Sequence, residues 1–437
     1  MSRRVALQNL GCKVNRYESD AILMQFENHG YEVVDFSEEA DIYLVNTCAV
    51  TAEAARKSRQ FLRRPKHLNP HALVVGLGCQ TELLEQDGEE VRYADLIIGN
   101  AYKDRAFEIV EEFLESGNQP DFMPIDRASD FAEFGPVSRQ KECRAYIKVQ
   151  DGCNNFCSYC TIPFARGRVR SRSRDKILQE ARALAKAGYK EVVLTGIHVC
   201  SFEMDQGKDS SAIVDLALEI ARIQGIERIR LTSLEPQSIT KEFVDKAKAN
   251  PKLCPHFHLS LQSGSDKTLK AMNRKYDTAQ FRRAGQYIKE AFPVVGLTTD
   301  VIVGFPGEDA KAFEESRDFC KEMGFSRMHV FRYSERPGTR AVKFPDKVPA
   351  SVAKERSQML IDLAREMEEA YFSKRQGQEA RVLLEQKNDQ GLWQGYTEDY
   401  IPCAIEEGTS AADLAEGEIV KTILKLNGPG LMHGEIA

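Results

Sequence analysis

Residues 145–160 read AYIKVQDGCNNFCSYC, and this stretch decides the fold of the central part of the chain. Its first six residues have the apolar character of a buried strand, and the loop that follows carries Cys153, Cys157 and Cys160. Five further strand-like runs follow along the chain, with helical patterns between them. About six successive strand–helix units favour a parallel sheet curved into a partial (β/α)6 barrel, which places its chemistry at the carboxyl ends of the strands.

The sequence on either side of this barrel has a different pattern. The amino-terminal part alternates short β-rich runs with helical segments and predicts a Rossmann-like parallel α/β domain. From about residue 377 the helical period stops, and short alternating runs predict a small antiparallel β-barrel. The expected division is an amino-terminal domain (1–116), a linker (117–141), the barrel core (142–372) and a carboxyl-terminal domain (373–437).

The expected elements can be given by residue number. Amino-terminal strands are expected at 5–10, 31–36, 41–46, 72–78 and 94–99, with helices near 17–29, 51–65 and 103–116. Barrel strands are expected at 145–150, 191–196, 228–233, 256–261, 295–304 and 327–333, with helices near 174–188, 211–223, 240–248, 277–291, 309–322 and 351–376. Carboxyl-terminal strands are expected at 380–386, 392–397, 400–405 and 418–426.

Composition limits the class of protein. The chain has 437 residues, 42% hydrophobic and 29% charged, which is typical of a soluble globular protein with two to four domains. It has no apolar run of the ~18 residues that a membrane span needs, and its start lacks the features of a signal peptide, so a cytoplasmic location without a membrane partner is expected. The net charge of −6 gives no whole-chain indication of nucleic acid.

The cysteines point to metal chemistry. There are 11 of them, which is an odd number for a disulfide framework. Cys153, Cys157 and Cys160 have the spacing C-x3-C-x2-C, and thiolates are the usual ligands of iron–sulfur clusters. A closed 4Fe–4S cluster takes four thiolates, so three would leave one iron open to a small ligand. A zinc site is the alternative, but structural zinc prefers two C-x2-C pairs or cysteines combined with histidines.

A second set of cysteines ends three strand-like runs of the amino-terminal part: Cys12, Cys48 and Cys79. Equivalent ends of parallel strands converge at one edge of a sheet, so these thiols could meet and bind a second cluster. Isolated buried cysteines are the equally plausible alternative from spacing alone. The other five, Cys143, Cys200, Cys254, Cys320 and Cys403, are expected to be structural.

Polar residues close several barrel strands and could bind a zwitterionic amino acid and a ribose. They are Thr195, Gly196, Ser233, Glu235, Gln262, Ser263, Asp300 and Glu308, and Arg332 and Tyr333 end the last expected strand. The alternative for Glu235 and Asp300 is a helix cap or an ion pair with a nearby arginine.

Two local basic stretches could bind nucleic acid. One has no Asp or Glu from Ala54 to Thr81 and contains Arg56, Lys57 and Arg59. The other places an arginine at every second position: Arg166, Arg168, Arg170, Arg172 and Arg174. In an extended strand these five would point to one side and suit phosphates. The alternative is a solvated charged face or a set of ion pairs.

The cysteine loop after the first barrel strand resembles the radical S-adenosylmethionine superfamily. The stretches LGCKVNRYESD, VNTCAVT and GLGC resemble the amino-terminal signature of its methylthiotransferases, and the likeness runs nearly end to end. The resemblance implies two 4Fe–4S clusters, S-adenosyl-L-methionine as cofactor, Tyr159 against its adenine and a carboxyl-terminal TRAM domain. The second cluster would hold or receive the sulfur to be inserted.

Within this family, LGCKVNRYESD resembles the group that acts on N6-threonylcarbamoyladenosine at position 37 of tRNA, and it departs at Lys13, Val14 and Asn15 from the GCQMN-like and GCPKN patterns of related groups. The implied activity is insertion of a methylthio group at carbon 2 of adenine. The implied partners are that tRNA, an electron donor such as flavodoxin or ferredoxin, and a sulfur donor, with no role for DNA. Isopentenyladenosine tRNA, ribosomal protein S12 and a non-catalytic iron–sulfur RNA-binding role are the alternatives.

Overall fold

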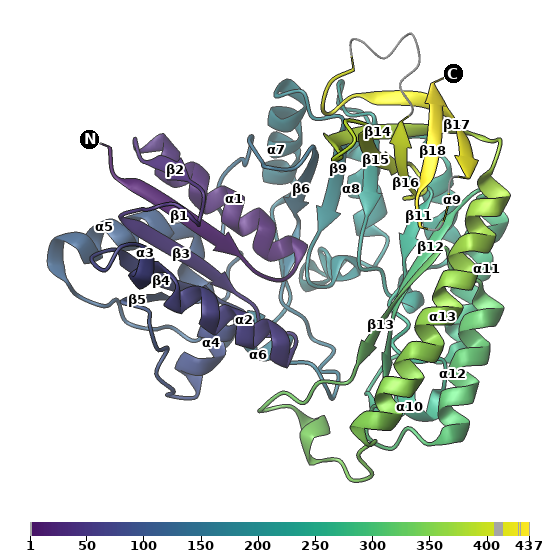
Figure 1. Cartoon of the computed structure of the whole chain (residues 1–437), viewed down its shortest axis with the longest axis horizontal. Coiled ribbons are helices and arrows are strands. Elements are labelled where there is room, and N and C mark those ends of the chain that lie inside the picture. The colour runs from purple at the N-terminus through teal and green to yellow at the C-terminus, as the bar shows by residue number, and fades with distance from the viewer. Residues whose placement is uncertain (1, 406–413, 427, 429, 437) are drawn as a thin grey trace.

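Figure 1 shows the computed structural model of the chain, which describes residues 2–405, 414–426, 428 and 430–436. An amino-terminal α/β lobe lies on the left, a curved barrel of strands and helices fills the centre and right, and a small β-barrel lies above it. No helix among the described residues combines the length and the apolar character needed to cross a bilayer.

The amino-terminal lobe is a five-stranded parallel sheet in the order β2-β1-β3-β4-β5. Its strands are β1 (Arg4–Asn9), β2 (Glu32–Val34), β3 (Ile42–Thr47), β4 (Leu73–Gly78) and β5 (Leu96–Ile98). Its helices are α1 (Lys13–Asn28), α2 (Ala52–Arg63), α3 (Pro65–Leu68), α4 (Cys79–Gln86) and α5 (Ala106–Ser116), with the 3-10 turn η1 (Asn100–Arg105).

Both faces of this sheet are covered, which explains why β3 and β4 are buried along their whole length. Residues of α1 and α5 pack with one face of the sheet, and α2 packs with the other. The expected Rossmann-like α/β domain is confirmed, and the short helix α4, which begins at Cys79, is an addition to the expected elements.

The central barrel has six parallel strands, as predicted. They are β6 (Arg144–Lys148), β9 (Glu191–Thr195), β10 (Arg228–Leu231), β11 (His256–His258), β12 (Gly296–Val303) and β13 (Arg327–Arg332). They form two three-stranded sheets, β10-β9-β6 and β11-β12-β13. Isolated parallel bridges, Ile229 to Leu253 and Leu234 to Leu259, connect the two halves.

Helices surround this barrel on its outer side. They are α7 (Arg174–Lys186), α8 (Ala212–Ile220), α9 (Lys241–Lys248), α10 (Asp266–Ala271), α11 (Thr278–Ala291), α12 (Ala310–Met323) and α13 (Ala350–Arg375). The shorter elements are β7 (Gln150–Asp151), α6 (Ile162–Arg166), β8 (Arg170–Ser171), and the 3-10 turns η2 (Ile125–Arg127), η3 (Val199–Ser201), η4 (Met204–Gln206), η5 (Pro236–Ser238) and η6 (Arg340–Lys343).

The carboxyl-terminal domain is a closed five-stranded barrel in the order β14-β15-β16-β18-β17. Its strands are β14 (Glu379–Lys387), β15 (Trp393–Thr397), β16 (Pro402–Ile405), β17 (Ile419–Leu426) and β18 (Met432–Ile436). The strand β18 was not expected, and its pairing with β16 is parallel, whereas the other pairings are antiparallel.

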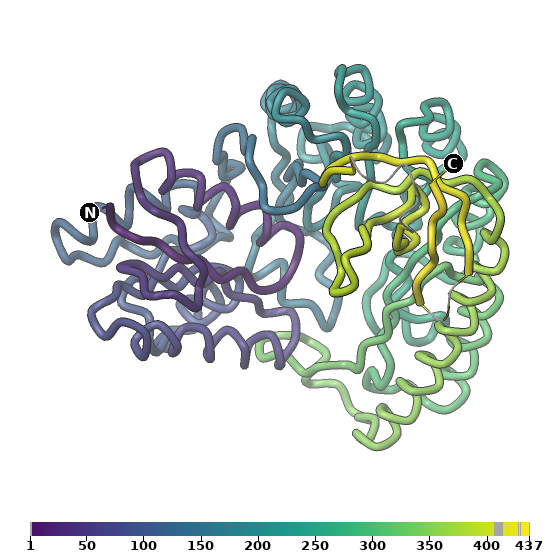
Figure 2. Tube along the Cα trace, turned by 45° about the horizontal axis from the view of Figure 1, so that its top comes forward, coloured from purple at the N-terminus to yellow at the C-terminus, as the bar shows by residue number. Residues whose placement is uncertain are grey.

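Buried arginines of the central barrel hold the carboxyl-terminal barrel against it through hydrogen bonds. Arg228 donates to the carbonyl of Tyr396 over 3.2 Å, and Arg230 donates to the carbonyl of Glu398 over 3.1 Å. Both guanidinium groups pair with Glu191 on β9, Arg228 at 3.4 Å and Arg230 at 2.9 Å. Figure 2 shows the result, with the carboxyl-terminal strands lying over one end of the central barrel.

Candidate functional site

Three cysteines meet at the carboxyl edge of the amino-terminal sheet. Cys12 caps the start of α1, Cys48 follows β3, and Cys79 is the first residue of α4, so each follows one of three neighbouring strands. Gly11 has a φ of +98°, and a Cβ built on it would lie 2.7 Å from Cys48 Sγ. We call Cys12, Cys48 and Cys79 the N-terminal triad. The tight approach at Gly11 means that a side chain there would separate two of its members.

Buried hydrogen bonds hold these loops together. Asn15 Nδ2 donates to the carbonyls of Leu10, over 2.7 Å, and Thr47, over 3.0 Å. The backbone N–H of Cys48 donates to Ser58 Oγ over 3.1 Å. The side chain of Asn15, which follows the Cys12 loop, therefore ties that loop to the loop that carries Cys48.

The second set of thiols, the core triad, lies in the loop between β7 and α6. The N–H of Cys153 donates to the carbonyl of Gly167 over 3.1 Å, and Ser158 donates to the backbone of the α10 segment through its N–H and its hydroxyl. Gly152 has a φ of +73°, and a Cβ on it would lie 1.9 Å from the carbonyl oxygen of Arg168. Cys157 and Cys160 complete the triad, and the loop is fixed at both ends.

Burial makes most of these thiols reluctant to ionise. It raises the pKa of Cys48 and of Cys153 to about 11, raises that of Cys160 to about 12, and raises that of Cys79 as well. Thiolates at these positions therefore need a bound cation or nearby guanidinium groups.

The donor set fits iron–sulfur clusters. Each triad consists of soft sulfur ligands, the type that such clusters use. Among the described residues, no three His, Cys, Asp or Glu side chains are gathered closely enough to hold a single metal ion. Three thiolates would hold three irons of a 4Fe–4S cluster and leave the fourth iron open, whereas structural zinc prefers two C-x2-C pairs or cysteines combined with histidines.

A buried arginine accompanies the core triad. Arg274 Nη1 donates to Cys157 Sγ over 3.3 Å, and Nη2 donates to both oxygens of Glu235 over 2.6 and 2.7 Å. Tyr276 accepts a hydrogen bond from Nε over 3.0 Å. The ion-pair alternative for Glu235 thus occurs in the structure, and this pair fixes a positive charge beside the core triad.

A buried ionic network lies between the two triads, with Arg166 at its centre. Arg166 Nε donates to Cys79 Sγ over 3.3 Å, Nη1 donates to Glu18 over 2.5 Å, and Nη1 also contacts Asp151 at 3.2 Å. Lys148 binds both carboxylates, Glu18 at 2.7 Å and Asp151 at 2.6 Å. Burial favours the neutral acid for both carboxyl groups, but the surrounding cations hold their pKa values below the ordinary range.

The expectation that five arginines point to one side of an extended strand is wrong. The chain forms α6, a turn and the two-residue strand β8 there instead of one extended strand. Arg166, Arg170 and Arg172 are buried, Arg172 in ion pairs with Glu133 and Glu180, so they cannot contact phosphates in this state.

The other two arginines of this row have different surroundings. Arg174 is half-buried and pairs with Glu203 and Glu219, whereas Arg168 is exposed and lies over the ring of Phe156, 4.5 Å from its centre. In contrast, the first basic stretch forms α2 and exposes its basic side chains, which are Arg56, Lys57, Arg59 and Arg63.

Most of the polar residues expected to bind the cofactor lie at the carboxyl ends of the barrel strands or beyond them, whereas Asp300 lies in the middle of β12. Thr195 ends β9, and Gly196 lies so close to Gln150 that a Cβ would meet its Oε1 at 2.9 Å. Ser233 and Gln262 have φ values of +55° and +65°, which is strained for residues with side chains and typical of functional loops. Ser263 follows in the same loop and is buried.

Asp300, Tyr159 and the last strand complete this group. Asp300 on β12 contacts His258 at 3.3 Å. Tyr159 packs edge-on against Phe305, with ring centres 6.4 Å apart, and Tyr333 packs against the same ring. Two other candidates have other surroundings, since Glu308 is paired with Arg356 at 2.7 Å and Arg332 is exposed.

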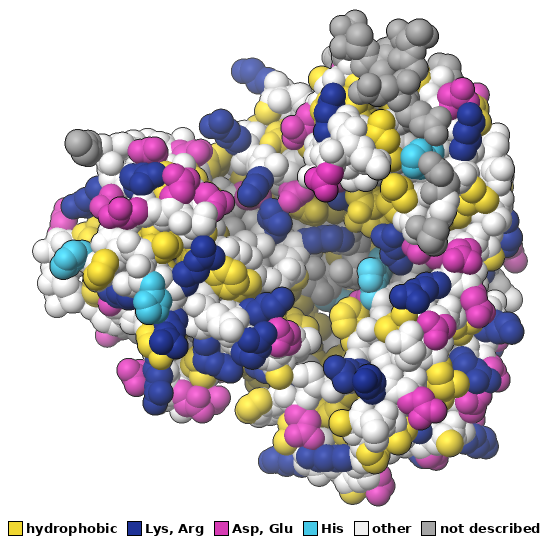
Figure 3. Space-filling model, viewed as in Figure 1, with side chains coloured by type: hydrophobic (Ala, Val, Ile, Leu, Met, Phe, Trp, Pro, Cys, Tyr) yellow, Lys and Arg dark blue, Asp and Glu magenta, His cyan; other side chains and the backbone are white. Residues whose placement is uncertain are grey.

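The three parts of the molecule face one another around a hollow that is visible in the middle of Figure 3 and has Lys or Arg and His side chains on its wall. Lys13, the residue after Cys12, lies near groups from all three parts, because its charge interacts with Tyr400, Arg144, Arg230 and Asp300. Its side chain is exposed to solvent, yet burial lowers its pKa. We call the hollow between the three parts of the molecule the central chamber.

Lys13 differs from its cationic neighbours in forming no ion pair among the described residues, although the carboxylate of Asp300 interacts with its charge from farther away. Arg144 pairs with Glu385 at 2.6 Å, and Arg230 pairs with Glu191. Over the ranges that the structure describes, the Lys13 ammonium makes no hydrogen bond or ion pair. The Lys13 ammonium is therefore available to bind an anionic ligand.

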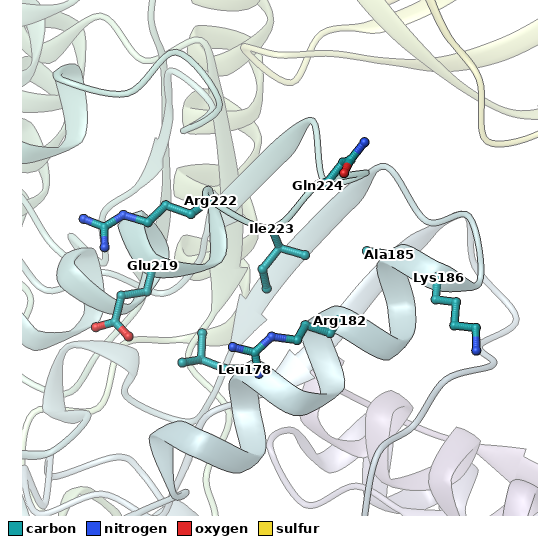
Figure 4. A pocket seen from close by; sticks show the side chains of 8 residues that line it. All are labelled: Leu178, Arg182, Ala185, Lys186, Glu219, Arg222, Ile223 and Gln224. Carbon is teal, nitrogen blue, oxygen red and sulfur yellow. The ribbon is translucent and has the colours of Figure 1, made fainter.

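Cavities elsewhere are less suited to the chemistry. The pocket in Figure 4 lies on the outer surface of the barrel between α7 and α8, with Arg182, Glu219 and Arg222 at its rim. A second cavity, of about 480 Å³, lies between the start of α2 at Thr51 and the barrel residues Gly304 and Tyr333. The second cavity adjoins Tyr333, a candidate near the site, whereas the first lies on the outer side of the barrel.

The sequence did not indicate the charged residues that support the two triads. Those residues are Glu18, Lys103, Lys148, Asp151, Glu235 in its pairing role, and Arg274. Asp151 could have been noticed because it stands two residues before Cys153. The others are far apart in sequence and carry no local pattern.

Comparisons with known proteins identify the family of the chain. A family model described as the radical SAM superfamily matches residues 147–320, and one described as uncharacterized protein family UPF0004 matches residues 4–99. The solved structure of the radical S-adenosylmethionine methyltransferase TsrM from Kitasatospora setae aligns with a TM-score of 0.57 at 17% identity, over 78% of this chain and 77% of that one. At that identity the likeness shows the fold alone.

Curated relatives are similar over most of the chain. The threonylcarbamoyladenosine tRNA methylthiotransferase MtaB of Aquifex aeolicus is 39% identical, over 88% of this chain and 93% of the relative. The enzyme of the same name from Bacillus subtilis is 37% identical over 97% and 94%. The tRNA-2-methylthio-N(6)-dimethylallyladenosine synthase of Thermodesulfovibrio yellowstonii is 34% identical over 96% of both.

Proposed function

The chain belongs to the radical S-adenosylmethionine methylthiotransferases, and on that premise we propose that it modifies N6-threonylcarbamoyladenosine at position 37 of tRNA. It is an enzyme of sulfur-group transfer, and the reaction replaces the hydrogen on carbon 2 of adenine by a methylthio group. The product is 2-methylthio-N6-threonylcarbamoyladenosine. The same enzyme class acting on isopentenyladenosine tRNA is the second candidate, favoured by relatives of that name at similar identity.

The cofactors of this family are 4Fe–4S clusters and S-adenosyl-L-methionine. When bound, they supply the electron that cleaves S-adenosylmethionine to a 5′-deoxyadenosyl radical and the sulfur that is inserted. We assign one cluster to Cys153, Cys157 and Cys160 and the other to Cys12, Cys48 and Cys79. The all-sulfur composition of each triad supports this assignment.

The barrel residues position the cofactor in this proposal. Thr195, Ser233 and Gln262 at or after neighbouring strand ends, and Asp300 within β12, offer hydroxyl, amide and carboxylate groups, where an amino-acid zwitterion and a ribose find donors and acceptors. Gly196 leaves room for the backbone to approach, with Glu235 and Ser263 nearby in the same loops. Tyr159 provides an aromatic surface for the adenine.

The charge of Lys13 is the observation that supports the threonylcarbamoyl substrate most directly. That group carries a carboxylate, whereas an isopentenyl group is uncharged. Lys13 follows Cys12, and it forms no ion pair among the described residues, whereas Arg144 and Arg230 are already paired with Glu385 and Glu191. A carboxylate bound there gains a charge-assisted hydrogen bond, which an isopentenyl group cannot make.

The exposed basic side chains of α2, together with Arg168, offer a surface for the tRNA backbone. Arg56, Lys57 and Arg59 lie close together in the sequence of α2, the helix that begins shortly after Cys48. Phosphate contacts position an RNA, while the modified base enters the chamber. The reaction also needs an electron donor, such as flavodoxin or ferredoxin, and a sulfur donor. The proposed location of the enzyme is the cytoplasm.

Tandem mass spectrometry of tRNA nucleosides from a deletion strain tests this function. We expect 2-methylthio-N6-threonylcarbamoyladenosine to disappear, with accumulation of N6-threonylcarbamoyladenosine, and to return on complementation with the intact chain but not with Cys153→Ala. Loss of the methylthio group from isopentenyladenosine instead would establish the second candidate. An unchanged set of tRNA nucleosides would refute both.

A further inference from the structure

Each thiol triad has one cysteine that accepts a hydrogen bond from a buried guanidinium. Arg274 donates to Cys157, and Arg166 donates to Cys79, each over 3.3 Å. The Arg166 side chain is 1% exposed, so water does not weaken its field. Unlike Arg274, whose charge is matched by Glu235, Arg166 belongs to a larger network whose charges do not balance.

The network around Arg166 has an excess of positive charge. Its two carboxylates are Glu18 and Asp151, and its four cations are Lys103, Lys148, Arg166 and Arg170. All six residues are buried. The four cations thus share two carboxylates at ion-pair distance, while the carboxyl groups of Glu82 and Asp104 interact with Lys103 and Lys148 only from farther away. A buried excess of positive charge is costly, so it favours an anionic group beside the network. The neighbour that can become anionic is the N-terminal triad, which Arg166 contacts through Cys79.

We propose that Arg166 is a positioning residue for the cluster at Cys12, Cys48 and Cys79, where its hydrogen bond to the Cys79 thiolate and its buried charge stabilise the reduced state. The inference rests on the proposed ligand assignment. A cluster that gains one electron becomes more negative by one charge, with no bond made or broken. A fixed cation therefore favours the reduced form and raises the potential, as hydrogen bonds to cluster sulfurs do.

The geometry explains why an arginine is present. Its Nε faces Cys79, while the terminal nitrogens contact Glu18, Asn15 and Asp151. One planar guanidinium thus contacts one sulfur and four oxygen acceptors from three residues at once, which a lysine ammonium cannot do in the same arrangement. Glu18 and Asn15 belong to α1 and Asp151 precedes the core triad, so the same side chain also joins the two lobes.

The test uses the full-length chain with Cys153, Cys157 and Cys160 changed to Ala, so that only the N-terminal cluster forms. After anaerobic reconstitution, iron and sulfide are counted, and the cluster is titrated with dithionite while the reduced form is followed by electron paramagnetic resonance. Arg166→Gln, Arg166→Lys and the exposed control Arg182→Gln are compared in this background. Arg166→Gln retains Lys103 and Lys148 beside Glu18, so no carboxylate is left without a cation.

We expect Arg166→Gln to lower the ratio of reduced to oxidised cluster about tenfold at a fixed solution potential, which is about 59 mV for one electron. Arg166→Lys keeps the charge but loses the bond to sulfur, and its ratio should fall less. Arg182→Gln should match the parent. An unchanged ratio in Arg166→Gln or in Arg166→Lys, with full iron content, overturns the inference and leaves the ligand assignment intact. No iron in the parent overturns both.

A measurement on the parent needs no substitution at Arg166. With arginine labelled by nitrogen-15 in its guanidinium, pulsed electron paramagnetic resonance of the reduced cluster should detect a nitrogen-15 coupling. The same coupling should be present with Arg182→Gln. Its absence from the reduced parent would contradict the hydrogen bond to Cys79, even if every Arg166 variant failed to fold.

Discussion

Arg274 and Glu235 form a bidentate ion pair in the interior, with two contacts of 2.6 and 2.7 Å to the same guanidinium nitrogen. Both side chains are buried, and the guanidinium also reaches Cys157. The pair links the loop after β10 to the segment after α10, so it fixes two strand-end loops around the core triad. Glu235, which was expected to contact the cofactor, therefore also stabilises the fold through its ion pair with Arg274.

Removing one partner of this pair should destabilise the chain. Arg274→Gln leaves the Glu235 carboxylate buried without its cation, which costs roughly 3–5 kcal/mol. We expect a clear fall in the midpoint of thermal unfolding of the iron-free protein, measured by circular dichroism. The double variant Arg274→Gln with Glu235→Gln should recover part of the loss. Equal stability of Arg274→Gln and the parent would show that the pair contributes little.

The two triads should separate in their effects on activity. Cys153→Ala should abolish formation of 5′-deoxyadenosine by the reduced, reconstituted enzyme. Cys48→Ala should retain some cleavage of S-adenosylmethionine while sulfur insertion into tRNA stops. Both products are measured in one reaction by liquid chromatography and mass spectrometry. Parallel loss of both products in Cys48→Ala would argue against two functionally separate clusters.

The charge of Lys13 should set the preference for an anionic substrate base. Lys13→Gln removes a charge-assisted hydrogen bond worth about 1.5–3 kcal/mol, so kcat/KM for threonylcarbamoyladenosine tRNA should fall about 10–100-fold. Lys13→Arg keeps the charge and should retain most activity. Iron content and cleavage of S-adenosylmethionine without tRNA serve as controls. A variant Lys13→Gln as active as the parent on this tRNA would exclude the role.

The fold could be predicted because its signals are local. The runs VALQNL, DIYLVN and LVVGLG became the parallel strands β1, β3 and β4, and each barrel strand was found at its expected place. A parallel strand that is buried on both faces needs a continuous apolar run, so such a run is itself a signal of the strand. The eight-residue helix α4 and the five-residue strand β18 were missed because such short segments show too little periodicity.

The supporting charges of the site could not be predicted for the opposite reason. Arg166 and Cys79 are 87 positions apart, and their contact exists only after two lobes dock. The alternating arginines of 166–174 suggested an exposed strand, but a helix, a turn and ion pairs with Glu18 and Glu180 override that pattern. A periodic pattern predicts which residues share a face only if the type of element is known. Here an extended strand was assumed, and the chain forms other elements.

The docking of the carboxyl-terminal barrel should depend on pH through Glu191. Burial raises the pKa of this carboxyl group, but Arg230 and Arg228 more than offset that effect and hold it at about 2, below its ordinary 4.5. A lowered pKa contributes stability above pH 4.5 that is lost as the pH falls toward 2. The contribution is about 3 kcal/mol for a shift of this size.

Glu191→Gln should therefore be less stable than the parent at pH 7 and show a weaker dependence on pH between 4.5 and 2. Thermal unfolding followed across that range measures both. The exposed variant Glu242→Gln on α9 is the matched control and should behave as the parent. A parallel pH dependence in Glu191→Gln and the parent would contradict the assignment of this titration to Glu191.

Binding of tRNA should depend on α2. Arg59→Glu combined with Arg63→Glu reverses two exposed charges on the helix that follows Cys48, and we expect weaker affinity and a salt dependence reduced by about one unit per lost phosphate contact. Arg182→Glu, on the outer surface of α7, is the control. Fluorescence anisotropy with labelled tRNA at several salt concentrations measures both quantities. Equal affinities for the α2 variant and the control would place the RNA elsewhere.

The central claim is that two sets of three thiolates each hold a separate 4Fe–4S cluster. Iron and sulfide counting after anaerobic reconstitution tests it most directly. The intact chain should bind about eight irons, and the variants lacking either Cys12, Cys48 and Cys79 or Cys153, Cys157 and Cys160 should each bind about four. About four irons in the intact chain, or no loss on removing one of the triads, would contradict the claim.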